Sequence, residues 1–83
     1  MMMKAYDELL DFLTSAPTPE QIVTFSPSRH TRQRLNELLR RKRAGLLSAE
    51  EFAELDEFNR AEQMMRRLIS RARQKLAHPA QQA

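Results

Sequence analysis

Proline and glycine, the residues that most often end a helix, occupy only five positions in this chain of 83 residues. The stretch between the single glycine, Gly45, and the last proline, Pro79, contains neither. Within it, apolar residues recur every three or four positions, which is the spacing of one face of an α-helix. The chain is therefore predicted to be all-α, with a long C-terminal helix.

The residues around position 48 predict where this long helix begins. Ser48 is expected to cap its first turn, and Glu51 to bond back to the cap, which completes a capping box. Leu47 and Phe52 flank the box in the positions of a hydrophobic staple. Gly45 suits the left-handed residue that ends a preceding helix. These signals together predict a tight turn between two antiparallel helices.

Two further helices are expected before that turn. The spacing of Tyr6, Leu9 and Leu13 predicts a short N-terminal helix. Ser26 is expected to cap the next helix, with Pro27 in its first position. The predicted helices cover residues 4–15, 27–44 and 49–77, in a single domain over residues 1–77 that is followed by a flexible tail at 78–83.

Between the first two helices lies a Pro-rich elbow. Thr18 and Gln21 can form a second capping box around Pro19, which suits the first position of a helix. The apolar residues that follow, Ile22 to Phe25, are too few for a long helix. We expect a short apolar turn there.

Charge alternates along the chain in four blocks, although the net charge is only +3. Residues 1–24 carry −3, residues 25–45 carry +6, residues 46–59 carry −5 and residues 60–83 carry +5. Such alternation favours antiparallel pairing, in which basic and acidic stretches lie side by side. The basic excess permits nucleic-acid binding without requiring it.

The helix expected at 27–44 is apolar only in its C-terminal half. Its leucines can cover the first apolar residues of the long helix; the two sets are Leu35, Leu38 and Leu39, and Phe52, Leu55 and Phe58. Residues 28–34 have no large apolar side chain, so this half is predicted to be solvated or reserved for a partner.

The helix expected at 27–44 has no apolar residues left to cover the rest of the apolar stripe on the long helix. At 1.5 Å per residue the two hairpin helices would measure about 27 Å and about 43 Å. The helix predicted at 4–15 can fold back over part of this stripe. Because exposed apolar stripes mark association surfaces, a second copy or another protein is predicted to cover the rest. The predicted partner-binding residues are Met65, Leu68, Ile69, Ala72 and Leu76.

Arginine predominates among the basic residues, and its planar guanidinium binds carboxylates and phosphates in bidentate fashion. Contact with a protein, contact with nucleic acid and simple solvation are equally compatible with the basic segment. The candidate contacts to phosphate or to an acidic partner are Arg29, Arg32, Arg40, Arg41 and Arg43.

No catalytic, cofactor-binding or metal-binding residues are predicted, and we do not expect an enzyme. The absence of cysteine excludes disulfides and thiolate metal sites. His30 and His78 have no second ligand at helical spacing, and Glu50 and Glu54 are better explained as solvated residues of a first turn. A single glycine leaves no phosphate-binding loop. No signal peptide or membrane span is expected, which predicts a cytoplasmic location.

Two family resemblances follow from these motifs. Residues 35–58 resemble the helical hairpin of SHOCT-type domains, with a leucine-rich helix, a Gly-Leu turn and a Ser-x-Glu-Glu-Phe helix start. A larger part of the chain resembles a group of small uncharacterised bacterial all-helical proteins that look like antitoxin-type or accessory partners of nucleases such as HNH enzymes. The matching segments are Tyr6–Phe12, Phe25–Ser28, Gly45–Glu51, Glu54–Asp56 and Ser70–Gln74.

The second resemblance implies a non-enzymatic interaction protein that binds a nuclease or toxin through its long C-terminal helix. Without that partner, the unmatched apolar stripe predicts a homodimer. A basic accessory protein that binds nucleic acid through the arginine-rich segments is the alternative.

Overall fold

The computed structural model describes residues 4–78, and within them the chain forms four helices and no strand. The helices are α1 (Lys4–Thr14), α2 (Pro19–Val23), α3 (Arg29–Arg43) and α4 (Ala49–Ala77). The predicted all-α class is confirmed, and α4 is the longest helix at 29 residues. Of the tail predicted at 78–83, all but His78 lies outside the described residues.

The turn between α3 and α4 is closed as the sequence predicts. The backbone N–H of Glu51 donates to Ser48 Oγ at 3.1 Å, and the backbone N–H of Ser48 donates to the Glu51 carboxylate at 3.0 Å. Gly45 has a φ of +72°, and the N–H of Leu46 reaches back to the carbonyl of Arg41 at 2.8 Å. This is the Schellman arrangement, which satisfies carbonyls that would otherwise lack partners at the helix end.

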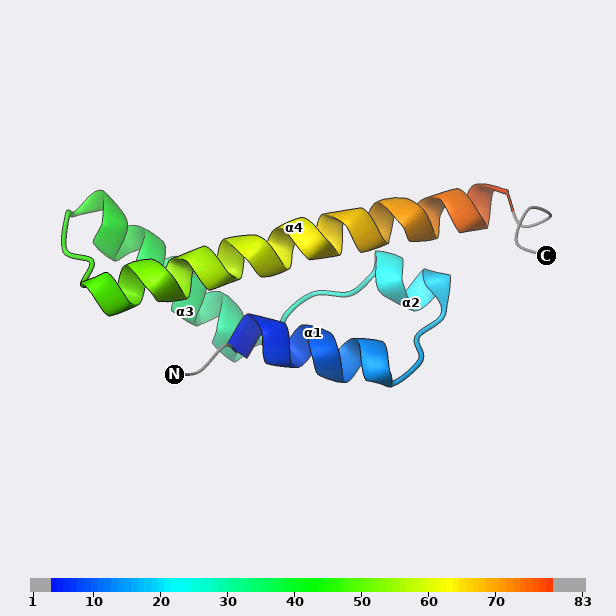
Figure 1. Ribbon diagram of the computed structural model, residues 1–83, viewed down its shortest axis with the longest axis horizontal. Helices are drawn as coiled ribbons and strands as arrows, with labels where there is room; N and C mark the ends of the chain where they lie inside the picture. Colours follow the sequence, from blue (N-terminus) through cyan, green and yellow to red (C-terminus); the bar gives the residue numbers. More distant parts are fainter. Residues whose placement is uncertain (1–3, 79–83) are drawn as a thin grey trace.

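A small apolar cluster joins α3 to α4, which run antiparallel through this turn (Figure 1). Leu38 is completely buried, and it clusters with Leu55 and Phe58 of α4. The half-buried residues packed around this cluster are Ala5, Leu35, Leu39 and Leu47. The predicted cover of α4 by the leucines of α3 is therefore confirmed at Leu55 and Phe58.

The predicted role of Phe52 is wrong. Its side chain is 56% exposed, so α3 does not cover it as predicted, whereas Leu47 packs on the buried cluster. The reason is helix geometry. Phe52 lies six residues before Phe58, and each residue turns the helix by about 100°. The two side chains therefore point about 120° apart around α4.

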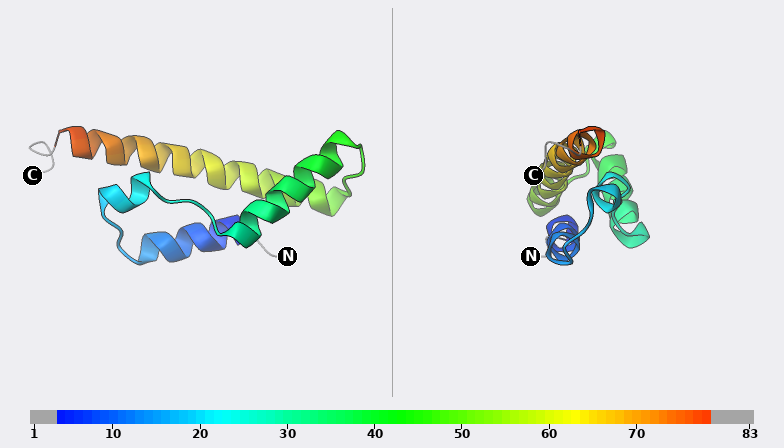
Figure 2. Two further views of the ribbon diagram at one scale, coloured as in Figure 1. Left: turned by 180° about the vertical axis from the view of Figure 1, so that it is seen from behind. Right: turned by 90° about the vertical axis from the view of Figure 1, so that its right-hand side faces the viewer.

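The second helix pairs with the long one, although the sequence predicted only a turn there. Thr18 and Gln21 form the expected capping box, and Pro19 is the first residue of α2. α2 packs against α4 on the side where α1 also lies (Figures 1 and 2). The rings of Phe12 and Phe25, whose centroids are 4.4 Å apart, hold the segments on either side of α2 together.

The molecule is a thin rod of 51 × 22 × 18 Å (Figure 2). Its radius of gyration is 15.3 Å, whereas a compact domain of this length would have about 12 Å. Its accessible surface of 6287 Å² also exceeds the roughly 5,100 Å² of a compact monomer of this mass. Much of the chain is therefore surface.

The turn between α3 and α4 can be tested by substitution. Ser48→Ala is expected to cost about 1 kcal/mol, because the first amides of α4 lose their acceptor. Gly45→Ala is expected to cost about 1–2 kcal/mol, and Gly45→Val more, since an L side chain is strained at positive φ even though open space surrounds the glycine. Thermal unfolding followed by circular dichroism measures these losses, and Ser70→Ala on the exposed middle of α4 is the matched control. Equal melting curves for all variants would contradict the hairpin as described.

Candidate interaction surfaces

A polar network ties α1 to the start of α3. One carboxylate oxygen of Glu8 accepts the backbone N–H of Ser28 at 2.8 Å, and the other accepts the hydroxyls of Ser28 and Thr31, each at 2.6 Å. Ser28 also caps α3 by accepting the backbone N–H of Thr31. The predicted cap at Ser26 is therefore wrong, because the carboxylate of Glu8 fixes the cap two residues later and α3 begins at Arg29.

The network also corrects, at Thr31, the prediction that residues 28–34 are solvated or reserved for a partner; Arg29, His30, Arg32 and Gln33 of this segment are exposed. Thr31 is only 1% exposed, although it is polar. Burial of Glu8 opposes its ionisation, but the hydrogen bonds from Ser28 and Thr31 outweigh this effect and lower the pKa of Glu8 below its ordinary value. The network thus favours the ionised carboxylate and joins the two helices.

A second polar network ties α3 to α4. The Nε and Nη2 atoms of Arg34 donate to the two oxygens of Glu54, both at 2.8 Å, and Nη1 donates to Glu37 at 2.7 Å. These bonds, that to Glu54 first, raise the pKa of the Arg34 guanidinium. Glu54 is therefore not the solvated first-turn residue that the sequence predicted. Bidentate geometry in a half-buried position makes this pair stronger than an ordinary surface ion pair.

Arg41 belongs to the same interface. Its Nε lies 3.1 Å from the Glu51 carboxylate, and its Nη2 donates to the carbonyl of Leu46. The backbone N–H of Ser48 and then Arg41 hold the pKa of Glu51 below its ordinary value. Arg41 was predicted to contact phosphate or an acidic partner, but the chain's own turn already occupies it. A helical wheel centred on Leu38 would have revealed this, because Arg34 and Arg41 fall on its flank.

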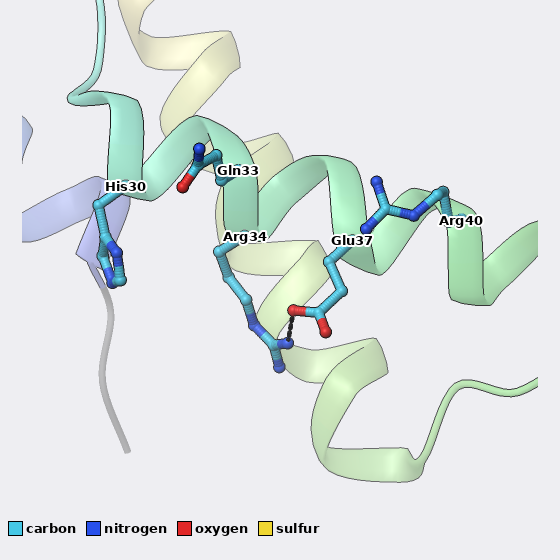
Figure 3. Close-up of a pocket in the computed structure, with 5 residues that line it drawn as sticks. All are labelled: His30, Gln33, Arg34, Glu37 and Arg40. Carbon is cyan, nitrogen blue, oxygen red and sulfur yellow. Dashed lines mark hydrogen bonds and ion pairs between the residues drawn. The ribbon is translucent and has the colours of Figure 1, made fainter.

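The other four arginines predicted as contacts remain open. Their side chains are exposed, and none forms an ion pair within residues 4–78; they are Arg29, Arg32, Arg40 and Arg43. A shallow depression of about 320 Å³ reaches one of them, Arg40; its other lining residues are His30, Gln33, Arg34 and Glu37. In Figure 3, Arg34 and Glu37 turn toward one another on one side of α3. The sequence therefore identified a basic surface, but assigned one arginine too many to it.

The predicted partner-binding stripe of α4 is largely covered by the chain itself. Ala72 is buried at 3% exposure, and Met65, Leu68 and Ile69 are half-buried. Leu76 is 41% exposed. α1 and α2 pack against this helix, which explains the cover, so the prediction that another chain must bury this stripe is wrong at Ala72.

Another part of α4 carries an open surface with apolar side chains, outside the predicted partner-binding residues. A depression of about 240 Å³ is lined by Tyr6 of α1 and by four residues of α4, and Leu10 lies one turn beyond Tyr6. Met64 is 46% exposed and Leu10 is 56% exposed. We name these residues the Met64 surface: Tyr6, Leu10, Arg60, Gln63, Met64 and Arg67. A helical wheel would have shown Arg60, Met64 and Arg67 on one face.

Within the part of the chain that the structure describes, no three histidine, cysteine, aspartate or glutamate side chains gather as a metal site would require. None of the described helices has a stretch long and apolar enough to span a bilayer.

Comparison with known proteins adds no further assignment. No protein-family model matches the chain, and neither a curated protein nor a solved structure is similar to it. The resemblances to SHOCT-type hairpins and to antitoxin-type proteins therefore stay predictions.

The network around Glu8 predicts a pH dependence of stability. Because folding lowers the pKa of Glu8 below its ordinary value of 4.5, its contribution is fully present above that value and is lost as pH falls through the folded pKa. Glu8→Gln should therefore lower the free energy of unfolding at neutral pH. In acid, the free energies of unfolding of the variant and of the parent should become more similar. Urea unfolding between about pH 7 and about pH 3 measures this difference. Glu50→Gln, at an exposed first-turn position of α4, is the control, and a difference for Glu8→Gln that does not change with pH would contradict the network.

Proposed function

We propose that this protein is a non-enzymatic interaction module that binds another protein along α4, and that the Met64 surface is the contact. The observation that carries the proposal is the exposure of Leu10 and Met64 beside the half-buried Tyr6. Two arginines, Arg60 and Arg67, flank these apolar residues.

This composition is typical of protein–protein contacts. Interfaces are enriched in tyrosine, methionine and arginine, and their strongest contacts are apolar anchors surrounded by polar side chains. Arg60 is already paired with Asp56 at 3.0 Å, whereas Arg67 forms no ion pair within the described residues. Arg67 is thus placed to bind a carboxylate on the partner. The expected partner presents apolar side chains beside an acidic group.

The shape of the molecule supports the same proposal. A rod with more surface than a compact monomer of this mass leaves apolar groups in water, and a partner would remove them. The family resemblance favours a nuclease or a toxin as that partner, and a cytoplasmic site of action. An antitoxin-like or accessory role follows from this choice of partner.

Partner binding can be tested with the product of the neighbouring gene, purified and titrated by calorimetry. Replacing Leu10 and Met64 together by glutamate is expected to weaken binding by at least about 100-fold, because truncated anchors of an interface each cost 2 kcal/mol or more. The control variant replaces Leu46 and Phe52 by glutamate, since these side chains are also more than half exposed but lie at the α3–α4 turn. Equal losses in both variants, or no loss in either, would contradict the proposed contact.

We also expect the isolated protein to self-associate through the same surface, most simply as a two-fold homodimer. Sedimentation at high micromolar concentration should find dimers of the parent and monomers of the Leu10→Glu, Met64→Glu variant. Met65 and Ile69 are unsuitable for this test because they are half-buried against the rest of the chain. If the parent sediments as a monomer, the proposed homodimer is wrong. Binding of a different protein is tested separately by the calorimetric titration.

A further inference from the structure

The outward side of α3 carries four arginines with no partner in the described part of the chain. Arg29, Arg32, Arg40 and Arg43 are all exposed, and at about 100° per residue they fall within one sector of the helix. This sector lies opposite Leu38, which is completely buried against α4. We name it the arginine face. It is a consequence of how the core orients α3.

Uncharged amides occupy the middle of the arginine face. Gln33 and Asn36 lie in the same sector as the arginines and are exposed. The pair Arg29 and Arg32 lies at one end, and the pair Arg40 and Arg43 lies at the other, with about 16 Å between the centres of the two pairs. The face therefore has a positive end, a neutral polar centre and a second positive end.

Nothing acidic interrupts this pattern. α3 has a single acidic residue, Glu37, which lies on its flank and is ion-paired with Arg34 at 2.7 Å. Glu8, at the start of α3, accepts hydrogen bonds from Ser28 and Thr31. Neither carboxylate forms an ion pair with the four arginines of the face, although Glu37 borders it beside Gln33 and Arg40.

We propose that α3 binds double-stranded DNA, with the arginine face in the major groove. The groove is about 12 Å wide and admits an α-helix. Its charge lies on the phosphates of the two strands at its borders, while uncharged base edges lie between them. The arginine face matches this order: its two arginine pairs reach phosphates on opposite strands, and its central amides meet base edges. Asparagine and glutamine pair with adenine in this position.

Two other occupants fit less well. The major groove of double-stranded RNA is deep and narrow, so a helix cannot enter it. Single strands are held by stacking on several aromatic side chains, and α3 has no phenylalanine, tyrosine or tryptophan. The proposed DNA surface shares no residue with the Met64 surface, so it goes beyond the function proposed above and does not depend on it.

The proposal can be tested by fluorescence anisotropy with a labelled DNA duplex of about 16 base pairs, at several concentrations of salt. Four phosphate contacts predict an affinity that falls about ten-fold for each doubling of salt. The test variant replaces the four arginines by glutamine: Arg29→Gln, Arg32→Gln, Arg40→Gln and Arg43→Gln. We expect it to lose at least about 100-fold in affinity at low salt, and to lose most of the salt dependence.

A control variant removes the same charge from α4: Arg66→Gln, Arg71→Gln, Arg73→Gln and Lys75→Gln. It should lose no more than about three-fold, because charges far from the DNA act only through screened attraction. Circular dichroism checks that both variants stay helical, and each arginine pair of the test variant is also replaced separately. Equal losses in the test and control variants would overturn the proposal, as would tighter binding of an RNA duplex or of polyglutamate than of DNA.

The central amides provide a second test. Replacing Gln33 and Asn36 by alanine should reduce the preference between A·T-rich and G·C-rich duplexes while leaving the salt dependence unchanged, because base contacts carry sequence information and phosphate contacts carry charge. If this variant binds every duplex as the parent does, the placement of α3 in the groove is wrong.

Discussion

Leu38 is the side chain on which the arrangement of the helices depends. It is completely buried, and it meets Leu55 and Phe58 of α4, with Ala5 of α1 beside them. Burial of one leucine contributes roughly 1.5–3 kcal/mol, which is a large share of the stability of so small a domain. Because this side chain must face inward, it fixes the rotation of α3. The orientation of every other side chain on α3 follows from that rotation.

The separation of the arginines shows this effect clearly. Arg40 and Arg41 are neighbours in the sequence, but each residue turns the helix by about 100°. Arg41 therefore lies beside α4 and pairs with Glu51, while Arg40 is exposed. The same rotation brings Arg34 to Glu54. The ion pairs hold the hairpin together, and the arginines that cannot reach α4 form the arginine face.

Local signals predicted α4 and the turn before it, whereas contacts between distant segments decided the rest. Ser48, Glu51 and Gly45 act within a few residues of one another, so the bounds of α4 could be read from the sequence. The start of α3 could not, because both Ser26 and Ser28 are suitable caps. The choice is made by Glu8, which lies 20 residues away from Ser28 in the sequence.

The candidate site was predictable only in part, for the same reason. The sequence identified the basic segment and the apolar stripe of α4, but not which side chains remain exposed. α2 is only five residues long, too short for its apolar residues to show a helical period, yet it packs against α4. Cover of this kind explains why Ala72 is buried while Met64, on another side of the helix, is open.

The length of α4 finally explains why open surfaces remain at all. Three helices of 11, 5 and 15 residues pack along a helix of 29 residues, and no further layer among residues 4–78 covers their outer faces. The two depressions lined by described residues are shallow and open, whereas sites for small molecules usually have walls on several sides. Its surfaces are long, convex and charged, and such surfaces gain most of their contact area from large partners. The same constraint that limits the core of this protein thus supports the proposals of a protein partner and of DNA.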